Sequence, residues 1–187
     1  SFSGFLEFGT AGLRGPVRPG PSGMNRAVVG RTATGIAAFL ISRGLSKVVI
    51  GRDARHGSAE FLQESAEILS GAGLDVHLLP RELPTPVLAF AVNDLKMDCG
   101  IMVTASHNPA IDNGYKVYLG GNIDGINFRG SQIIAPIDKE VSRLISEVSL
   151  PSPRGSSWKI VGEDLIEHYV STCAEGSSEA TAQKIVY

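Results

Sequence analysis

The sequence has 187 residues, which is the size of one ordinary domain with a further segment attached. Hydrophobic residues make up 43% of it, so a packed core is expected and wholesale disorder is excluded. The 17 lysines and arginines stand against 19 aspartates and glutamates, a balance that points to neither a nucleic acid nor an anionic membrane as partner.

Cysteine usage and the first residues of the chain bear on location. Cys99 lies in an apolar run and Cys173 in a helix-like stretch, so we expect reduced thiols rather than a disulfide framework. The first 23 residues lack a basic segment followed by an apolar run, and no window of about 18 uninterrupted apolar residues occurs. We therefore expect a cytoplasmic protein.

The first part of the chain alternates helix and strand patterns. Apolar residues recur at helical spacing within 25–43, and Gly44 can end that helix by taking a positive φ. The β-branched run 47–51 predicts a buried strand. A second helix is expected to start at Ser58, whose hydroxyl would cap it, and residues 74–79 predict the next strand.

The alternation continues as far as residue 148. A helix is predicted at 85–95, strands at 99–103 and 114–119, and a last helix at 137–148. The connection before the strand 114–119 is too short for a parallel crossover, so we expect that strand to be antiparallel and at an edge. The fold class is therefore predicted to be α/β, a layered α/β/α domain with a mixed, mostly parallel sheet.

A change of composition then predicts a domain boundary. Proline and serine dominate residues 150–157, and both disfavour helix and buried strand. We expect domain I at 1–149, a linker at 150–161 and the start of a truncated domain II at 162–187. Within that last part the sequence predicts a short helix, a polar stretch and a strand, at about 162–174, 175–183 and 184–187.

The richest set of reactive side chains follows the strand 99–103, in Thr104-Ala105-Ser106-His107-Asn108-Pro109. Loops at the carboxyl ends of strands are where open α/β sheets place their chemistry. Ser106 offers an oxygen nucleophile, and His107 and Lys116 offer charge and proton transfer. A hydroxyl is a weak nucleophile without a base, a metal or a preloaded group. By itself this loop is more often turn chemistry than a nucleophile.

A second segment, Phe8-Gly9-Thr10-Ala11-Gly12-Leu13-Arg14-Gly15, combines closely spaced glycines with an arginine. Backbone N–H groups of such glycines can approach an anion, and Arg14 could add a forked charged contact. The segment is neither a P-loop nor a dinucleotide fingerprint. Many glycine-rich turns bind nothing, so this pattern alone is weak.

A third segment, Gly51-Arg52-Asp53-Ala54-Arg55-His56, also follows a predicted strand. We interpret it as a strand-to-helix turn held by an Arg–Asp pair, in preference to a part of a site. Arg52 and Arg55 are accordingly expected to contribute mainly to stability.

Together these motifs resemble the α-D-phosphohexomutases. The runs 8–15, 51–55 and 104–116, with Pro84-Thr85-Pro86 between them, occur in that family in the same order and spacing. The variants here are most similar to the bacterial phosphoglucomutase/phosphomannomutase branch, and the resemblance covers nearly all of residues 2–150. It identifies this part as the N-terminal domain of a four-domain enzyme.

The resemblance implies an enzyme that moves a phosphoryl group between the 1- and 6-positions of a hexose phosphate. The serine matching Ser106 carries a phosphoryl group, donates it to the sugar phosphate, and recovers the other phosphoryl group from the resulting bisphosphate. The implied catalytic residues are Ser106, His107, Lys116 and Arg14, and the implied phosphate- or substrate-binding residues are Thr10, Gly12, Asn108 and Asn113.

The resemblance further implies a Mg²⁺ ion and a sugar bisphosphate as primer. The phosphate on Ser106 is one expected metal ligand, and the others belong to an Asp-x-Asp-x-Asp run in domain II, which residues 1–187 do not contain. The remaining domains of the same chain are thus expected partners, and this part alone is expected to be inactive. The alternatives are a phosphopentomutase, a phosphoglucosamine mutase, or a non-catalytic phosphate-binding module.

Overall fold

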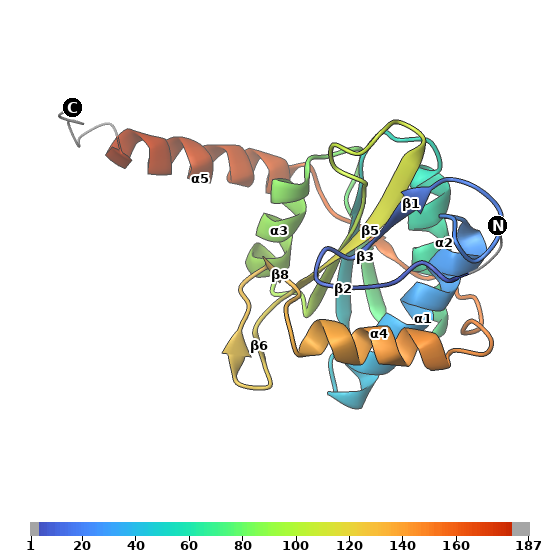
Figure 1. Cartoon of the computed structure of the whole chain (residues 1–187). Coiled ribbons are helices and arrows are strands. Elements are labelled where there is room, and N and C mark those ends of the chain that lie inside the picture. The colour runs from blue at the N-terminus through green and yellow to red at the C-terminus, as the bar shows by residue number, and fades with distance from the viewer. Residues whose placement is uncertain (1–3, 181–187) are drawn as a thin grey trace, which may run out of the picture.

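A mixed sheet forms the centre of the molecule in the computed structural model, which describes residues 4–180 (Figure 1). Its strands run in the order β1-β5-β4-β2-β3-β9, and β8 pairs with β5. They are β1 (Leu13–Pro16), β2 (Lys47–Arg52), β3 (Asp75–Leu78), β4 (Cys99–Val103), β5 (Asp112–Leu119), β8 (Ser131–Gln132) and β9 (Lys159–Ile160). The strands β2, β3, β4 and β9 are parallel, whereas β5 is antiparallel to β4, β1 and β8.

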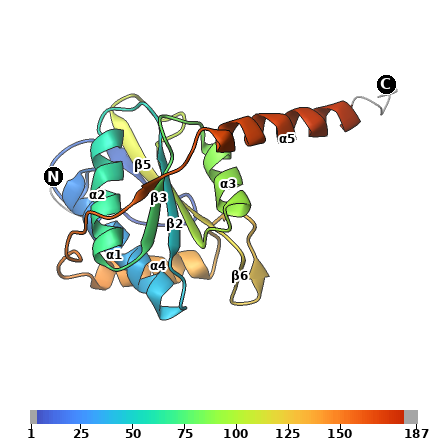
Figure 2. The same ribbon diagram turned by 180° about the vertical axis from the view of Figure 1, so that it is seen from behind.

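Helices cover both faces of this sheet. They are α1 (Arg26–Ser42), α2 (Ser58–Gly71), α3 (Thr85–Asp94), α4 (Ile137–Glu147) and α5 (Asp164–Ala180). Figures 1 and 2 show α1 and α2 on one side of the sheet and α3 on the other, with α4 packed along α1. Alternate residues of β5 serve the two layers, since Tyr115 packs with the α1 and α2 core and Tyr118 with the α3 core. The predicted α/β/α class with a mostly parallel sheet is confirmed.

The helix α1 has the boundaries and the buried stripe that the sequence predicts. The Asn25 side chain caps it by accepting a hydrogen bond of 3.1 Å from the N–H of Val28. Gly44 follows with a φ of +69°, as expected for a residue that ends a helix. The predicted inward-facing residues are all buried, namely Val29, Ala33, Ile36 and Leu40.

The start of α2 differs from the prediction. Gly57, with a φ of +80°, occupies the N-cap position, and Ser58 is the first residue of the helix. The Ser58 hydroxyl instead donates a hydrogen bond of 2.7 Å to Oδ1 of Asp53 in the preceding turn. The expected cap at Ser58 is therefore wrong, because Gly57 occupies the N-cap position and Ser58 already lies inside the helix.

The strand predicted at 114–119 is antiparallel as expected, but it is not at the edge of the sheet. It starts two residues earlier, as β5, and β1 pairs along its outer side. β1 is the second half of the glycine-rich segment 8–15. Only Leu13 of its four residues presents a large apolar side chain to the core, so no strand pattern is visible in the sequence.

Residues 120–131 form a small hairpin between β5 and β8. Its strands are β6 (Asn122–Ile123) and β7 (Ile126–Asn127). Ile123 and Phe128 are buried in the core that α1 and α4 share, so this stretch contributes to packing.

The predicted linker, residues 150–161, lies against the sheet domain. Two oxygens of the buried Glu64 side chain accept hydrogen bonds from the Arg154 guanidinium, at 2.6 and 2.9 Å. At the end of this segment β9 extends the sheet by pairing with β3. The division into domain I, linker and domain II stays a prediction.

The helix predicted at 162–174 is longer than expected and continues as α5 to Ala180, through part of the predicted polar stretch. Both views show α5 leaving the side of α3 and pointing away from the sheet domain (Figures 1 and 2). The strand predicted at 184–187 falls outside the described residues. Within residues 4–180, no helix has the length and apolar character needed to cross a membrane.

Candidate active site

Three neighbouring strands bring Arg14, Ser106 and Lys116 together near the carboxyl end of β4, whereas Thr10 lies beside Asp138 and Gln132. The N–H of Thr104 donates to the carbonyl of Gly114 at 3.0 Å, and Gly114 in turn pairs with Arg14 across β5 and β1. Ser106 follows Thr104 by two residues on the same loop. The glycine-rich segment and the serine loop (residues 104–112) are distant in the sequence and are therefore brought side by side by the fold.

Arg14 and Lys116 lie on the same face of the sheet. Side chains of a strand alternate between faces, so Gly114 and Lys116 share one face, and Arg14 shares it as the partner of Gly114. A Cβ atom at position 114 would lie 3.0 Å from Cγ of Arg14. The missing side chain of Gly114 thus makes room for the Arg14 stem to lie across β5.

The charges of these two residues influence each other. Partial burial lowers the pKa of Lys116, and the positive charge of Arg14 lowers it further. Among the described residues neither cation has a carboxylate partner, and the buried Nε of Arg14 has no hydrogen-bond partner. Arg43, by contrast, contacts both Asp124 and Glu140. Two close, unpaired cations are the arrangement that an anion stabilises.

Ser106 has a backbone conformation that side-chain-bearing residues rarely adopt. Its φ of +56° is in the left-handed region, which costs about 1–3 kcal/mol for a residue other than glycine and persists only when the surroundings hold it. The Ser106 N–H donates to Oγ1 of Thr104 at 2.9 Å, and its carbonyl accepts from Nη2 of Arg55 at 2.7 Å. No described residue hydrogen-bonds its hydroxyl. The backbone is thus fixed while the nucleophile stays free.

The two residues that follow Ser106 have different environments. His107 is exposed, and its ring has no hydrogen bond or ion pair with any described residue. Its predicted catalytic role stays a prediction. The Asn108 side chain donates to Oδ2 of Asp112 at 3.0 Å and thereby closes the loop on itself. That contact does not test whether Asn108 also reaches a phosphate.

Asn113, predicted to bind phosphate or substrate, is fully buried. Its amide nitrogen donates to the carbonyl of His56 and to Oγ of Ser58, both at 2.9 Å. Its amide oxygen accepts from the N–H of Gly114 at 2.7 Å. In this structure the side chain therefore joins β5 to the turn after β2, and its phosphate or substrate contact stays a prediction.

The glycine-rich segment makes a tight turn. Gly9 and Gly12 each donate an N–H to the carbonyl of the other, at 3.1 and 2.7 Å. The turn thus uses the N–H of Gly12, and the predicted phosphate or substrate contact of Gly12 stays a prediction. The Thr10 hydroxyl donates to Oδ2 of Asp138 at 2.5 Å, and its phosphate contact stays a prediction.

Gly12 is required for packing. Its φ is +80°, and a Cβ atom there would lie 2.1 Å from the carbonyl oxygen of Tyr115. We expect Gly12→Ala in the full-length protein to lower the free energy of unfolding by about 1–3 kcal/mol, visible as a lower melting temperature. Gly9→Ala is the matched control, because nothing lies within 4 Å of its Cβ position. Equal melting temperatures of the two variants would contradict the packing role.

Sequence reasoning missed the connection between Arg55 and the serine loop. The predicted Arg–Asp pair is present, with Nε of Arg55 3.4 Å from Oδ2 of Asp53. The same guanidinium also donates to backbone carbonyls of the loop between β4 and β5. The available signal was weak: Arg55 follows β2, and β2 lies beside β4 only once the sheet order is known.

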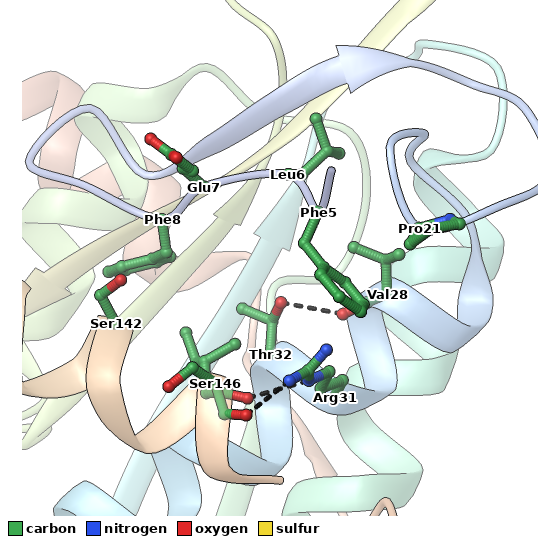
Figure 3. A pocket seen from close by; sticks show the side chains of 11 residues that line it. Phe5, Leu6, Glu7, Phe8, Pro21, Val28, Arg31, Thr32, Ser142 and Ser146 are labelled. Atoms are coloured by element: carbon green, nitrogen blue, oxygen red, sulfur yellow. Dashed lines mark hydrogen bonds between the residues drawn. The ribbon is translucent and has the colours of Figure 1, made fainter. Parts of the chain in front are cut away.

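An apolar pocket of about 160 Å³ lies elsewhere on the molecule (Figure 3). The segment 5–8 covers it, and its walls come from α1 and α4. The Arg31 guanidinium stacks over the Phe5 ring, 4.6 Å from its centroid, and donates to the carbonyls of Ile145 and Ser146 at the end of α4. None of the predicted site residues lines this pocket, so we assign it no part in the chemistry.

Comparisons with known proteins identify the family of this chain. The sequence matches the family model for phosphoglucomutase/phosphomannomutase, alpha/beta/alpha domain I, over residues 6–145. It is 42% identical over 164 residues to a probable phosphomannomutase of Haemophilus influenzae, covering 84% of this chain and 32% of that protein. It is 36% identical over 177 residues to a phosphopentomutase of Homo sapiens, covering 89% of this chain and 28% of that protein.

A solved structure shows the same fold. The putative phosphomannomutase from Thermus thermophilus superposes with a TM-score of 0.73 at 31% identity, covering 86% of this chain and 34% of that chain. The present chain thus spans about a third of the length of the proteins it matches. The chain belongs to the phosphoglucomutase/phosphomannomutase family, and it contains the α/β/α domain I of that family.

Proposed function

We propose that the protein containing this chain is a phosphoglucomutase/phosphomannomutase, which transfers a phosphoryl group between the 1- and 6-positions of a hexose phosphate. The observation that carries this proposal is the pair of unpaired cations, Arg14 and Lys116, beside a loop that presents the free hydroxyl of Ser106. Phosphoryl transfer depends mostly on positioning and on neutralising spread negative charge, which such a pair supplies.

In the proposed reaction Ser106 carries the phosphoryl group in the resting enzyme. A free hydroxyl of the sugar phosphate attacks that phosphorus, the bond from phosphorus to Oγ of Ser106 breaks, and a sugar bisphosphate forms. The bisphosphate turns over in the site and returns its other phosphoryl group to Ser106. Arg14 and Lys116 stabilise the transferring group, and His107 is the candidate on the same loop for moving the hydroxyl proton.

The proposal includes a Mg²⁺ ion and a sugar bisphosphate that primes the enzyme. The phosphate on Ser106 would be one ligand of the metal. The described residues contain no group of three histidines, cysteines, aspartates or glutamates that could hold a metal ion. This domain therefore does not fit a complete magnesium site, and we derive no step through the metal.

A phosphopentomutase is the second candidate, because one of the matched relatives bears that name. The two candidates differ in the sugar on which the enzyme acts. Glucose 1-phosphate, mannose 1-phosphate and ribose 1-phosphate, assayed in parallel with the full-length protein, would decide between them.

We also propose a cytoplasmic location, which cell fractionation would test.

Residues 1–187 alone are expected to show no mutase activity. The proposed reaction needs further metal ligands and a sugar-binding surface, which we place in the remaining domains of the same protein. A coupled assay with glucose 1-phosphate, Mg²⁺ and a bisphosphate primer should detect turnover by the full-length protein only. Turnover by residues 1–187 at rates near those of the full-length protein would contradict the proposal that the reaction needs groups from the remaining domains.

A further inference from the structure

The Arg55 guanidinium is bound almost entirely by the backbone of the serine loop. Its Nη2 donates to the carbonyls of Ser106 and Asn108 at 2.7 and 2.8 Å. Its Nη1 donates to the carbonyls of Pro109 and Asp112 at 2.8 and 3.0 Å. One side chain from the turn after β2 thus holds the loop between β4 and β5 at four points along its length.

The orientation of this guanidinium is itself fixed. Oδ2 of Asp53 lies 3.4 Å from Nε of Arg55, and Oδ1 of the same carboxylate accepts from the Arg55 N–H at 3.0 Å. Oδ1 also accepts from the Ser58 hydroxyl, which Asn113 of β5 contacts in turn. The turn, the start of α2 and the start of β5 therefore form one hydrogen-bonded unit around Arg55.

These contacts leave Arg55 no free donor for a phosphate. Four carbonyl oxygens accept from the four hydrogens of the two Nη atoms, and Nε faces the Asp53 carboxylate. Arg14, in contrast, has a buried Nε without a partner. Arg14 and Arg55 therefore differ in role: the donors of Arg55 are taken up within the protein, whereas Arg14 has a donor without a partner among the described residues.

We propose that Arg55 is a positioning residue that sets the place of the Ser106 nucleophile without touching the transferred phosphoryl group. The left-handed conformation of Ser106 depends on partners for its backbone, and Arg55 is the partner of its carbonyl. In-line transfer tolerates little displacement of the attacking or leaving oxygen. This inference rests on the function proposed above.

The test compares variants of two arginines from the same turn in the full-length protein. Arg55→Lys keeps the charge but places it on one nitrogen, which cannot span four carbonyls. Arg52→Lys is the matched control, because the Arg52 guanidinium pairs with Glu82 at 2.7 Å and donates to the carbonyl of Asp53, both outside the serine loop. We expect Arg55→Lys to lower kcat by about 10- to 100-fold with KM little changed. Arg52→Lys should keep both constants.

Peptide-level hydrogen exchange gives a second measurement that does not depend on activity. We expect faster exchange of residues 104–112 in Arg55→Lys than in the wild type and in Arg52→Lys, at temperatures where all three proteins are folded. Faster exchange with unchanged kcat would overturn the proposal, and so would a higher KM with unchanged kcat, which would assign Arg55 to substrate binding. If Arg55→Lys does not fold, Arg55→Gln takes its place in both measurements.

The two proposals fail in different ways. A wild-type full-length protein without mutase turnover would overturn the proposed function, and the exchange measurement would still decide whether Arg55 orders the loop. Turnover by the wild type, with kcat and loop exchange both unchanged in Arg55→Lys, would overturn the positioning role alone.

Discussion

Alanine in place of Ser106 should abolish mutase turnover in the full-length protein, with kcat reduced by about 10⁴-fold or more, the size of effect seen when a covalent nucleophile is removed. The remaining residues of the site cannot replace it, because the proposed reaction passes the phosphoryl group through Oγ of Ser106. The left-handed backbone and the fixed carbonyl hold that oxygen in place, so the substitution removes an atom without removing a packing contact.

Phosphopeptide mass spectrometry of the purified wild-type protein should find the phosphoryl group on Ser106. Ser142→Ala, on α4 and outside the serine loop, is the control and should keep both the modification and the turnover. Turnover surviving unchanged in Ser106→Ala would remove this serine from the mechanism. A phosphoryl group on another residue would relocate the nucleophile.

Alanine in place of Arg14 or of Lys116 should lower kcat by about 10²–10³-fold, which corresponds to about 2–4 kcal/mol of lost transition-state stabilisation. Neither residue has a carboxylate partner among the described residues, so neither substitution breaks an ion pair of the fold. Removing one of two close positive charges also relieves their repulsion. The melting temperature should therefore stay the same or rise.

Arg43→Ala is the control, and it should affect the stability of the protein instead of its activity. Arg43 contacts Asp124 of the hairpin and Glu140 of α4, and neither of these residues belongs to the serine loop. We expect a lower melting temperature and an unchanged kcat for this control. A lower melting temperature with unchanged kcat in Arg14→Ala and Lys116→Ala would instead assign both cations to the fold.

The pH dependence of the reaction offers an independent check on Lys116. Its ammonium is charged only below its pKa, which burial and the charge of Arg14 lower. Activity should therefore decline as the pH rises through this lowered pKa. In Arg14→Ala the second cause is removed, so the residual activity should persist to higher pH than in the wild type. A decline at the same pH in both proteins would show that another group controls it.

Most of the fold could be predicted from local sequence patterns. The stripe of α1 and the β-branched run of β2 each bury a continuous apolar surface, and such patterns depend only on spacing along the chain. β1 could not be predicted in this way, because a short, glycine-rich strand buries little and owes its pairing to β5. Ser58 likewise misled the prediction, because the N-cap position falls on Gly57, whose positive φ of +80° the sequence pattern does not reveal.

The candidate site could also be predicted from the sequence only in part. The sequence by itself, through motifs that resemble a known family, predicts Ser106, Arg14 and Lys116 as site residues, because residue type and motif spacing are properties of the chain. Only the tertiary structure showed that the Asn113 side chain hydrogen-bonds within the protein and that Arg55 hydrogen-bonds the backbone of the serine loop. The reason is physical: whether a polar group is free or satisfied depends on the partners that sheet order brings near it, and β2, β4 and β5 become neighbours only when the sheet has formed.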